Sequence, residues 1–482
     1  MAGTAQAAHP RQQAPAHGWW PLVVIASAHL MAILDNTVMF VALPSAQHSL
    51  GMTVSDRQWV VTAYTLAMAG LLLVGGRLAD RLGARRTLLA GVAGFACASA
   101  AGGASVSAFM LISARAVQGA FAAVLISSTK SLLISVYRDE GERTRVMGVF
   151  TATLTSGAAA GLLLGGVLTS ELSWRWCLYV NVAFALVAVI GAPRVLPALP
   201  GRREVQIDVI SALLATAGMA ALVFGLGEAS AYGFGSAQIS GSLSAAAVLL
   251  GWFVARQAGR PDRLLPLRVV LDRNRGWAMT GLIVNALSSF GMLLILTYQL
   301  QSVMRYSALQ TGLALLPFAA AAAAGSAFLA PVLMRRIRPR WLITAGIAAE
   351  AAGLVPLIWL TPGSRYVPLI LAATLIEGIS TGIAAPAALN TALSQVPPSA
   401  TGAAGAATST ASQLGSSIGA ALLNTIAAAA TAGYLAANPA ASVATGTVHG
   451  FTIAMASAVI ITLAAAIPAA VFINATVPRP AR

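Results

Sequence analysis

The sequence has few charged residues, and few of those are acidic. Only 9% of its 482 residues are charged and 58% are hydrophobic, whereas soluble domains carry about a quarter charged residues. A water-soluble core could not bury so much apolar sequence. The composition therefore excludes an ordinary soluble domain and predicts a chain that crosses a membrane many times.

Cysteine and lysine are nearly absent. The two cysteines, Cys97 and Cys177, exclude a disulfide framework and a clustered thiolate metal site, and we interpret both as small core residues. The only lysine, Lys130, follows Thr129 rather than a glycine. The chain therefore lacks a glycine-rich phosphate loop ending in lysine, and ATP cannot drive it through such a site.

Side chains for metal binding or covalent catalysis are not grouped. No metal pair at helical spacing is formed by the five histidines, His9, His17, His29, His48 and His449. The sequence also shows no group of a nucleophile, a base and an orienting acid that could form a catalytic triad. We expect no metal site, no cofactor and no enzyme activity.

Basic residues outnumber acidic ones by 29 to 14, which gives a formal net charge of +15. In a soluble protein this excess would suggest a nucleic-acid partner. Here the basic residues lie in short clusters between apolar runs, without a continuous basic face or interleaved aromatic residues. We therefore expect a lipid bilayer, and no nucleic acid, as the partner.

Fourteen windows are apolar enough to cross a bilayer as helices, since a span needs about 20 residues. They are 21–43, 58–79, 87–106, 109–133, 146–168, 176–196, 207–228, 240–258, 277–300, 311–334, 341–361, 366–392, 403–428 and 450–473. The first window is long enough to span and no signal-peptide pattern surrounds it. The fold class is therefore an all-α, multi-pass membrane protein.

The distribution of arginine predicts the orientation. Most basic residues lie at the two termini and in the loops 76–86, 137–145, 194–206, 256–275 and 335–340. These segments alternate along the chain, and basic loops remain on the cytoplasmic side. Both termini are therefore expected in the cytoplasm. Nearly all of the basic residues are arginine. Alanine is also abundant, and both features are typical of a GC-rich bacterial genome.

The chain contains an internal repeat at an offset of about 255 residues. Gly161 and Gly165 fall over Gly415 and Gly419, and basic loops precede corresponding helices. This predicts two six-helix bundles, residues 1–200 and 270–482. The two helices within 207–258 would be inserted between them.

Four ionisable residues lie well inside predicted spans: Asp35, Arg115, Glu350 and Glu377. Each costs about 2.5–3.5 kcal/mol on insertion scales, so such residues usually face a cavity or a partner. A buried carboxylate near an arginine can bind and release a proton as access alternates. We favour this role for Asp35 and Arg115 over an ion pair that only joins two helices. We interpret Glu350 as a neutral packing residue, and for Glu377 both interpretations stay open.

Amide side chains in the 277–300 span and just beyond it are a second set of candidates. Asn285, Gln299 and Gln301 could face a substrate or could bond to neighbouring helices. Both interpretations remain open.

Several segments carry a resemblance to a known family. They are Leu34–Asp35–Asn36–Thr37 running to Ala42–Leu43–Pro44, the loop from Gly76 to Arg86, and Arg115, Gln118 and Gly119. Trp174, Arg175, Trp176, Asn181, Gln301, Tyr306, Gly312 and Pro317 add to it. The chain resembles the fourteen-spanning drug/proton antiporters of the major facilitator superfamily.

The resemblance implies roles for these residues. Proton coupling would involve Asp35, Arg115 and Glu377, and the substrate cavity would include Asn285, Gln118 and Gln299. A conformational latch would comprise Asp80, Gly76, Gly83, Arg81 and Arg85, and a hinge in the fifth helix would comprise Gly157, Gly161, Gly165 and Gly166. Leu162 stands where the family usually has a proline, which leaves the transport direction open.

The resulting hypothesis is proton-coupled efflux of antibiotics or other small amphipathic compounds across the bacterial cytoplasmic membrane. The protein would be a monomer that works by alternating access. A proton-coupled nutrient symporter on the same fold is the first alternative. A membrane receptor or enzyme without transport is the second.

Overall fold

The computed structural model describes residues 19–137, 140–198, 201, 208–233, 235–258, 272–396 and 401–473. In these ranges the regular elements are all helices. The first six are α1 (Trp20–Leu50), α2 (Val54–Leu82), α3 (Ala84–Gly103), α4 (Ala108–Val136), α5 (Glu140–Glu171) and α6 (Trp176–Val195). Next come α7 (Val209–Gly227), the short α8 (Ala229–Tyr232) and α9 (Ala237–Ala258).

The remaining helices run from residue 273 to residue 472. They are α11 (Arg273–Tyr298) with η1 (Gln299–Val303), α12 (Ala308–Ala324), η2 (Gly325–Leu329), α13 (Ala330–Arg336), α14 (Pro339–Leu354) with η3 (Val355–Trp359), η4 (Tyr366–Ile370), α15 (Leu371–Leu393), α16 (Thr401–Ala437) and α17 (Val443–Phe472). Each of the fourteen sequence windows overlaps a helix or a run of consecutive helices.

Most of these helices could cross a membrane. Within the described ranges, eleven are long and apolar enough, or twelve if the bent α2 is one span. The other two windows, 87–106 and 146–168, lie on α3 and α5, and the Ala159–Glu171 part of α5 is a shorter apolar helix. The prediction of an all-α, multi-pass fold is confirmed.

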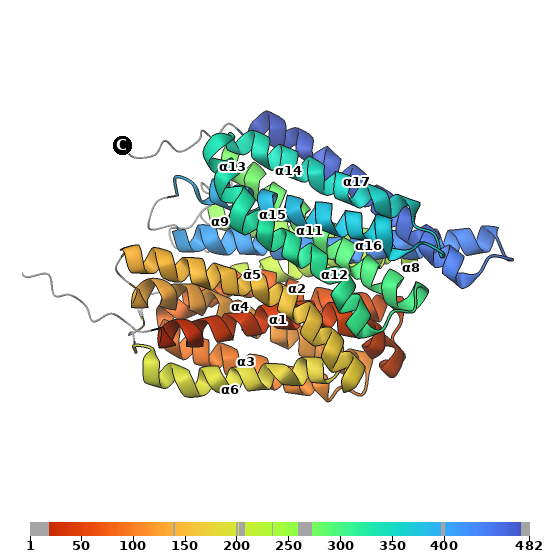
Figure 1. Ribbon diagram of the computed structural model, residues 1–482. Coiled ribbons are helices and arrows are strands. Elements are labelled where there is room, and N and C mark those ends of the chain that lie inside the picture. The colour runs from red at the N-terminus through yellow and green to blue at the C-terminus, as the bar shows by residue number, and fades with distance from the viewer. Residues whose placement is uncertain are drawn as a thin grey trace, which may run out of the picture.

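The two halves of the chain occupy different sides of the molecule. Figure 1 shows α1–α6 together in the lower part and α11–α17 together in the upper part. The first described residues of α1 and the last of α17 lie at the same end of the molecule, on the left of Figure 1. We call this the terminal end and the opposite one the distal end. The domain boundaries drawn from the sequence stay a prediction.

The internal repeat is visible in how the second helix of each half begins. Thr53 and Asp56 form a capping box at the start of α2, with Asp56 N donating to Thr53 Oγ1 at 3.1 Å. Ser307 and Gln310 form the same box at the start of α12, with a bond of 3.2 Å. Both boxes satisfy backbone N–H groups that a helix start leaves free.

The glycine pairs of the repeat also occupy matching places. Gly161 and Gly165 of α5 lie against α1, next to Thr37 and Val38. Gly415 and Gly419 of α16 lie against Ile283 and Leu287 of α11. In both halves the fifth helix therefore packs closely on the first, because glycine lets two backbones approach.

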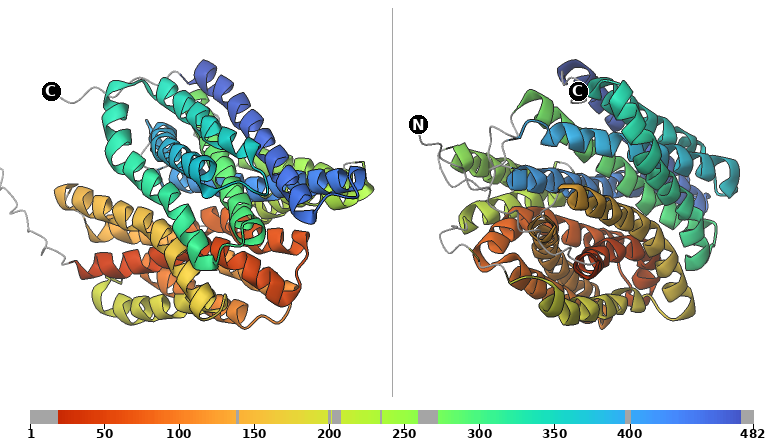
Figure 2. Two further views of the ribbon diagram at one scale, coloured as in Figure 1. Left: turned by 45° about the vertical axis from the view of Figure 1, so that its right-hand side comes forward. Right: turned by 60° about the vertical axis from the view of Figure 1, so that its left-hand side comes forward.

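Of the two inserted helices, α7 contacts α2 and α16, one from each half, and α9 packs against α7 (Figure 2). Leu66 of α2 and Ala421 of α16 belong to the same apolar cluster as Met219 of α7 and Phe253 of α9. Glu228 accepts hydrogen bonds from Ser55 and from Trp59 Nε1. Apolar packing and these hydrogen bonds therefore hold the inserted segment against the first half of the molecule.

The two cysteines differ in burial. Cys177 is buried, but Cys97 is exposed, so the prediction that both are core residues is wrong for Cys97. The reason is physical. In a membrane helix the outward face is as apolar as the core, so apolar neighbours in the sequence do not distinguish the two.

Candidate functional site

A buried ion pair lies in the middle of the first half. Arg115 of α4 donates through Nη1 to Asp35 Oδ2 of α1, and their side chains are 1% and 0% exposed. Asp35 Oδ1 accepts two further bonds of 2.7 Å, from Gln118 Nε2 and from Asn181 Nδ2. The carboxylate therefore has both a countercharge and a full set of donors, which compensates for its burial.

Arg115 is held by three helices. Its Nε donates to the carbonyl of Val60 on α2 at 3.2 Å, and its Nη1 also donates to Gln118 Oε1 at 2.7 Å. Its guanidinium carbon lies 4.3 Å from the centre of the Tyr64 ring, a cation–π contact. Any change in the charge of Asp35 would therefore act on α1, α2 and α4 together.

Ser99 of α3 completes this cluster. Its hydroxyl accepts from Gln118 Nε2 at 2.5 Å and from Asn181 Nδ2 at 3.0 Å. The sequence singled out Asp35, Arg115 and Gln118 but missed Ser99, because serine is too common in membrane helices to be a signal. Asn181 stood out only through the family resemblance.

The second half has its own buried polar cluster, formed by α11, α14 and α15. Glu377 Oε1 accepts from Ser288 at 2.8 Å and from Ser289 at 3.4 Å. Glu350 Oε1 accepts from Asn285 Nδ2 at 2.5 Å. No ion pair to either carboxylate is found among the described residues, so this cluster lacks the countercharge that Arg115 supplies in the first half.

The hydroxyl of Thr381 links the two carboxylates of this cluster. It lies 3.3 Å from Asn285 Nδ2 and 3.0 Å from the Ser289 hydroxyl. A bond to Asn285 makes Glu350 part of this network, and its interpretation as a neutral packing residue stays a prediction. Its partner is 65 positions away in the chain, so only tertiary structure could reveal the pairing.

A cavity of about 280 Å³ lies between the two halves. Thr37 and Leu162 from the first half line it, together with residues of α11, α12, α15 and α16, namely Leu282, Asn285, Ala286, Ser289, Phe290, Leu293, Phe318, Ala319, Ala322, Thr381, Ala385, Ser412, Gln413 and Ser416. Its volume is close to the lower end of the range for ligand pockets, about 300–1,000 Å³.

The residues proposed from the sequence for the substrate cavity lie in different places. Asn285 lines the cavity between the halves. Gln118 belongs to the Asp35 cluster. Gln299 is buried in η1, and neither side-chain atom has a hydrogen-bond partner in the described part of the chain. A substrate role for these residues stays a prediction.

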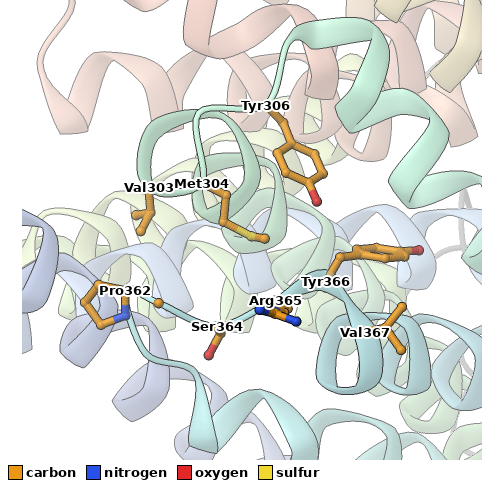
Figure 3. A pocket seen from close by; sticks show the side chains of 9 residues that line it. Val303, Met304, Tyr306, Pro362, Ser364, Arg365, Tyr366 and Val367 are labelled. Carbon is orange, nitrogen blue, oxygen red and sulfur yellow. The ribbon is translucent and has the colours of Figure 1, made fainter.

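A larger hollow of about 790 Å³ lies at the distal end, between the α11–α12 connection and the α14–α15 connection. Figure 3 shows Tyr306 and Tyr366 on its two sides, with Arg365 between them and the loop residues Pro362 and Ser364. It is open, and none of the buried carboxylates lines it. The cavity between the halves is the better candidate site because residues of the buried network line it.

Polar contacts join the halves at the distal end. Arg57 of α2 donates to Asn424 Oδ1 of α16 at 2.5 Å, and its guanidinium carbon lies 3.9 Å from the Tyr298 ring centre. Tyr298 in turn donates to Gln47 Oε1 at 2.8 Å. Gln301 Nε2 donates to the carbonyl of Val41 at 2.8 Å. This end of the seam is therefore held closed by several bonds.

The proposed hinge glycines of α5 face two neighbours. Gly157, Gly161 and Gly165 lie against α1, whereas Gly166 lies against Leu309 of α12. From the other side, Gly312 of α12 lies against the backbone of Leu162. The α5–α12 contact between the halves therefore depends on a glycine from each helix.

Two members of the proposed latch lie at the surface. Asp80 and Arg81 are exposed, and no bond to Asp80 is found among the described residues. Arg85 Nη1 donates to the carbonyl of Leu196 at 3.0 Å. Gly83 joins α2 to α3 with φ at 90°, a conformation that favours glycine. The latch role stays a prediction.

Comparisons with known proteins agree with this architecture. The family model described as Major Facilitator Superfamily matches residues 25–420. The puromycin resistance protein pur8 of Streptomyces alboniger is 43% identical over 95% of this chain and 91% of its own length. The cephamycin export protein CmcT of Amycolatopsis lactamdurans is 38% identical over 86% of this chain and 85% of its own length.

Solved structures show the same fold. One is a bacterial homologue of the human lysosomal transporter Spinster in an inward-facing, unoccupied conformation. It has a TM-score of 0.66 and 16% sequence identity, and the match covers 97% of this chain and 100% of that chain. The matched family, these relatives and the multi-span helical fold lead to one identification: this chain is a membrane transporter and belongs to the major facilitator superfamily.

Proposed function

We propose that this transporter exports antibiotics or other small amphipathic compounds across the bacterial cytoplasmic membrane in exchange for protons. The observation that carries the proposal is the Asp35–Arg115 pair, an intramembrane charge pair within the bundle of a transporter. The functions for which the two relatives are named, puromycin resistance and cephamycin export, support the outward direction and the antibiotic class. Both termini would then lie in the cytoplasm.

Asp35 is the proposed proton-binding residue. When its carboxylate is protonated, Arg115 loses its countercharge, and an unpaired buried charge costs about 3–5 kcal/mol. The donors Gln118 and Asn181 must also adjust, since Asp35 Oδ1 accepts from both. Proton binding would therefore favour a different packing of α1 against α2, α4 and α6. Glu377 is the proposed second proton site, in the other half.

Alternating access is the proposed mechanism. The cavity lies between the halves, and the bonds around Arg57 hold the distal end closed. In this state a compound would enter from the terminal end, which the arginine-rich loops assign to the cytoplasm. Opening of the distal seam would release it outside. The segments 1–200 and 270–482 would move against each other, with 207–258 between them and the protein acting as a monomer.

The proton gradient provides enough energy for this exchange. A charge that crosses 100 mV releases about 2.3 kcal/mol, which corresponds to a gradient of roughly 50-fold for an exported compound. One proton for each transported molecule would therefore be sufficient to confer resistance.

The proposal can be tested by flux in inverted membrane vesicles that contain the full chain. We expect puromycin, or another compound of a toxic panel, to accumulate inside the vesicles when their interior is acidic. A protonophore should abolish the accumulation. Movement in the opposite direction would indicate a symporter, and no flux of any compound under an imposed pH gradient would indicate a protein without transport.

A further inference from the structure

The junction between α7 and α8 contacts both halves of the molecule at the distal end (Figure 1). Glu228, the residue between the two helices, accepts hydrogen bonds from the Ser55 hydroxyl and from Trp59 Nε1 of α2, in the first half. The carbonyl oxygen of Gly227, the last residue of α7, accepts from the Thr425 hydroxyl of α16, in the second half. Two adjacent residues of the inserted segment therefore bind opposite sides of the seam.

At the same place α2 and α16 also bond directly to each other. Asn424 Nδ2 donates to Gln58 Oε1 at 3.0 Å, and Asn424 Oδ1 accepts from Arg57. A Cβ added to Gly227 would collide with Gln58 Nε2 and would lie 3.5 Å from Ala421 Cβ. Glycine at this position therefore lets the backbone of α7 approach both helices of the seam.

Further along its length, α7 packs on the same two helices. The hydroxyls of Thr65 on α2 and Ser417 on α16 are 2.6 Å apart across the seam. Met219 of α7 belongs to one apolar cluster with Leu66 of α2 and Ala421 of α16. Because this packing includes both halves, α7 cannot retain all of it when α2 and α16 separate.

The attachments of the inserted segment to the two halves differ in kind. Glu228 accepts two bonds from α2, and hydrogen bonds to a carboxylate are about twice as strong as bonds between neutral groups. Gly70 of α2 lies against Thr216 of α7, so these two helices also approach closely. The bond from Thr425 of α16 joins a hydroxyl to a backbone carbonyl, both neutral. The attachment to the second half should therefore break first.

We propose that the inserted segment is a clasp for the distal seam. It is bound to α2 through Glu228 and to α16 through the carbonyl of Gly227, and it adds to the closure of the distal end. When the seam opens, the segment stays with the first half, and the bond from Thr425 breaks. The inference rests on the proposed function only in taking alternating access as the movement that separates α2 from α16.

The test measures distances between pairs of spin labels on the full chain in lipid nanodiscs by pulsed electron paramagnetic resonance. The background carries Cys97→Ala and Cys177→Ala. The labels are attached through Ser49→Cys in the first half, Gln238→Cys in the inserted segment and Ser302→Cys in the second half, all at exposed positions. The distance between labels 49 and 302 follows the seam, and the label at 238 shows which half the inserted segment accompanies.

We expect Thr425→Val, which retains the shape of the side chain but removes the donor, to raise the ratio of open to closed molecules by about two- to tenfold. The distances from Ser302 to Ser49 and to Gln238 should both gain a longer component. The distance between Ser49 and Gln238 should stay unchanged, because the inserted segment remains on α2.

Thr408→Val is the matched control. Thr408 is also a buried threonine of α16, but its hydroxyl donates to Gly405 of the same helix at 2.8 Å. This variant should retain the wild-type distances, and so should Thr425→Ser, which keeps the hydroxyl. If thermal unfolding shows that Thr425→Val does not fold, Arg57→Ala opens the same seam, and the label at Gln238 must again accompany the first half.

Unchanged distances in Thr425→Val would overturn the inference, and so would a label at Gln238 that accompanies Ser302 when the seam opens. A longer distance between Ser49 and Ser302 in Arg57→Ala, with none in Thr425→Val, would overturn the clasp alone and leave alternating access intact. Unchanged distances in both variants would contradict the proposed closure as well. The coupling and direction of export are decided separately by the vesicle flux.

Discussion

Each half of the molecule has buried carboxyl groups at its centre, but their surroundings differ. Asp35 accepts bonds from Arg115, Gln118 and Asn181, so its charge is balanced inside the protein. Among the described residues, Glu350 and Glu377 accept from neutral side chains alone. The proposed proton exchange at Asp35 would therefore disturb a balanced ion pair, whereas no described cation balances Glu350 or Glu377.

At this scale we expect Asp35→Asn to abolish drug-stimulated proton movement in vesicles. The amide retains the size of the side chain but cannot bind and release a proton, and it leaves Arg115 without a countercharge. The uncompensated charge should lower the free energy of unfolding by about 3–5 kcal/mol. Proton uptake is read from a pH-sensitive dye and stability from thermal unfolding. Asp272→Asn, the same change at the start of α11, should retain proton movement.

The double variant Asp35→Asn with Arg115→Gln separates proton coupling from a purely structural ion pair. Removal of both charges should recover much of the lost stability, because no unpaired charge remains. Proton-driven flux should stay absent. If the double variant transports like the wild type, the pair only joins α1 to α4.

At the scale of elements, the contact between α5 and α12 depends on small residues. A Cβ added to Gly166 would lie 2.8 Å from Leu309 Cα and 3.0 Å from the carbonyl oxygen of Ala308. These are backbone atoms, so the two helices would have to separate. Closure of the seam between the halves should therefore be sensitive to this position.

We accordingly expect Gly166→Ala to lower the thermal stability of the closed state and to slow transport severalfold. Vesicle flux and thermal unfolding provide the two measurements. Gly241→Ala on α9 is the control, because a Cβ there meets nothing within 4 Å. Similar behaviour of the two alanine variants would show that the close approach is unimportant.

The start of α7 offers a prediction about pH. Burial opposes ionisation of Asp208, but bonds from the hydroxyl and the backbone N–H of Ser211, at 2.6 and 3.1 Å, outweigh it together with Arg256. The pKa of this carboxyl is therefore lowered from its ordinary value of 3.8. Because the pKa of Asp208 is lower in the folded state than in the unfolded state, its ionisation stabilises the fold at pH values above the ordinary pKa of 3.8. This stabilisation is lost as the pH falls through the pKa of the folded state.

Asp208→Ala should therefore destabilise the protein by about 1 kcal/mol near neutral pH, the typical cost of losing such a helix cap. The difference from the wild type should shrink in acid. Thermal unfolding across this pH range provides the check, with Asp56→Ala, which removes the third-position acid of the capping box of α2, for comparison. A difference that does not depend on pH would show that the charge of Asp208 is not involved.

At the scale of the whole molecule, the proposed alternating access depends on the opening and closing of the distal seam. Arg57 contacts Asn424 and Tyr298, both in the second half, and Tyr298 also bonds to Gln47 of the first half. Hydrogen bonds to a charged group contribute about 1.5–3 kcal/mol. The loss of Arg57 should therefore shift the population of the molecule toward states with an open distal end.

This shift can be measured by labelling in whole cells. With Cys97 and Cys177 replaced by alanine, a cysteine is introduced at Ser416 in the cavity. We expect Arg57→Ala to increase its labelling by a membrane-impermeant thiol reagent from outside by about tenfold or more. Arg175→Ala is the matched control, because Arg175 donates to Ser105 within the first half at 2.7 Å. Equal labelling in the two variants would contradict the proposed closure.

Several features could be predicted from the sequence because they depend on local physics. The helices follow from apolar runs of spanning length, and the place of the charges in those runs singled out Asp35, Arg115 and Glu377. Asn285 was proposed as a cavity residue and lies in the cavity lining. The exposure of Cys97 and the bonding of Glu350 could not be predicted, since a helix in lipid is apolar on every face and does not indicate which face meets a neighbour.

The sequence by itself determined the class of the molecule, the places and order of its apolar helices and the expected side of its basic loops. These follow from the cost of placing polar groups and charges in hydrocarbon, which acts on each segment independently. Only the tertiary structure decided that Arg115 neutralises Asp35 while Glu350 and Glu377 remain without a described cation, and that Arg57 reaches across to Asn424. Such pairings depend on which helix faces meet, and those contacts form between residues that are far apart in the chain.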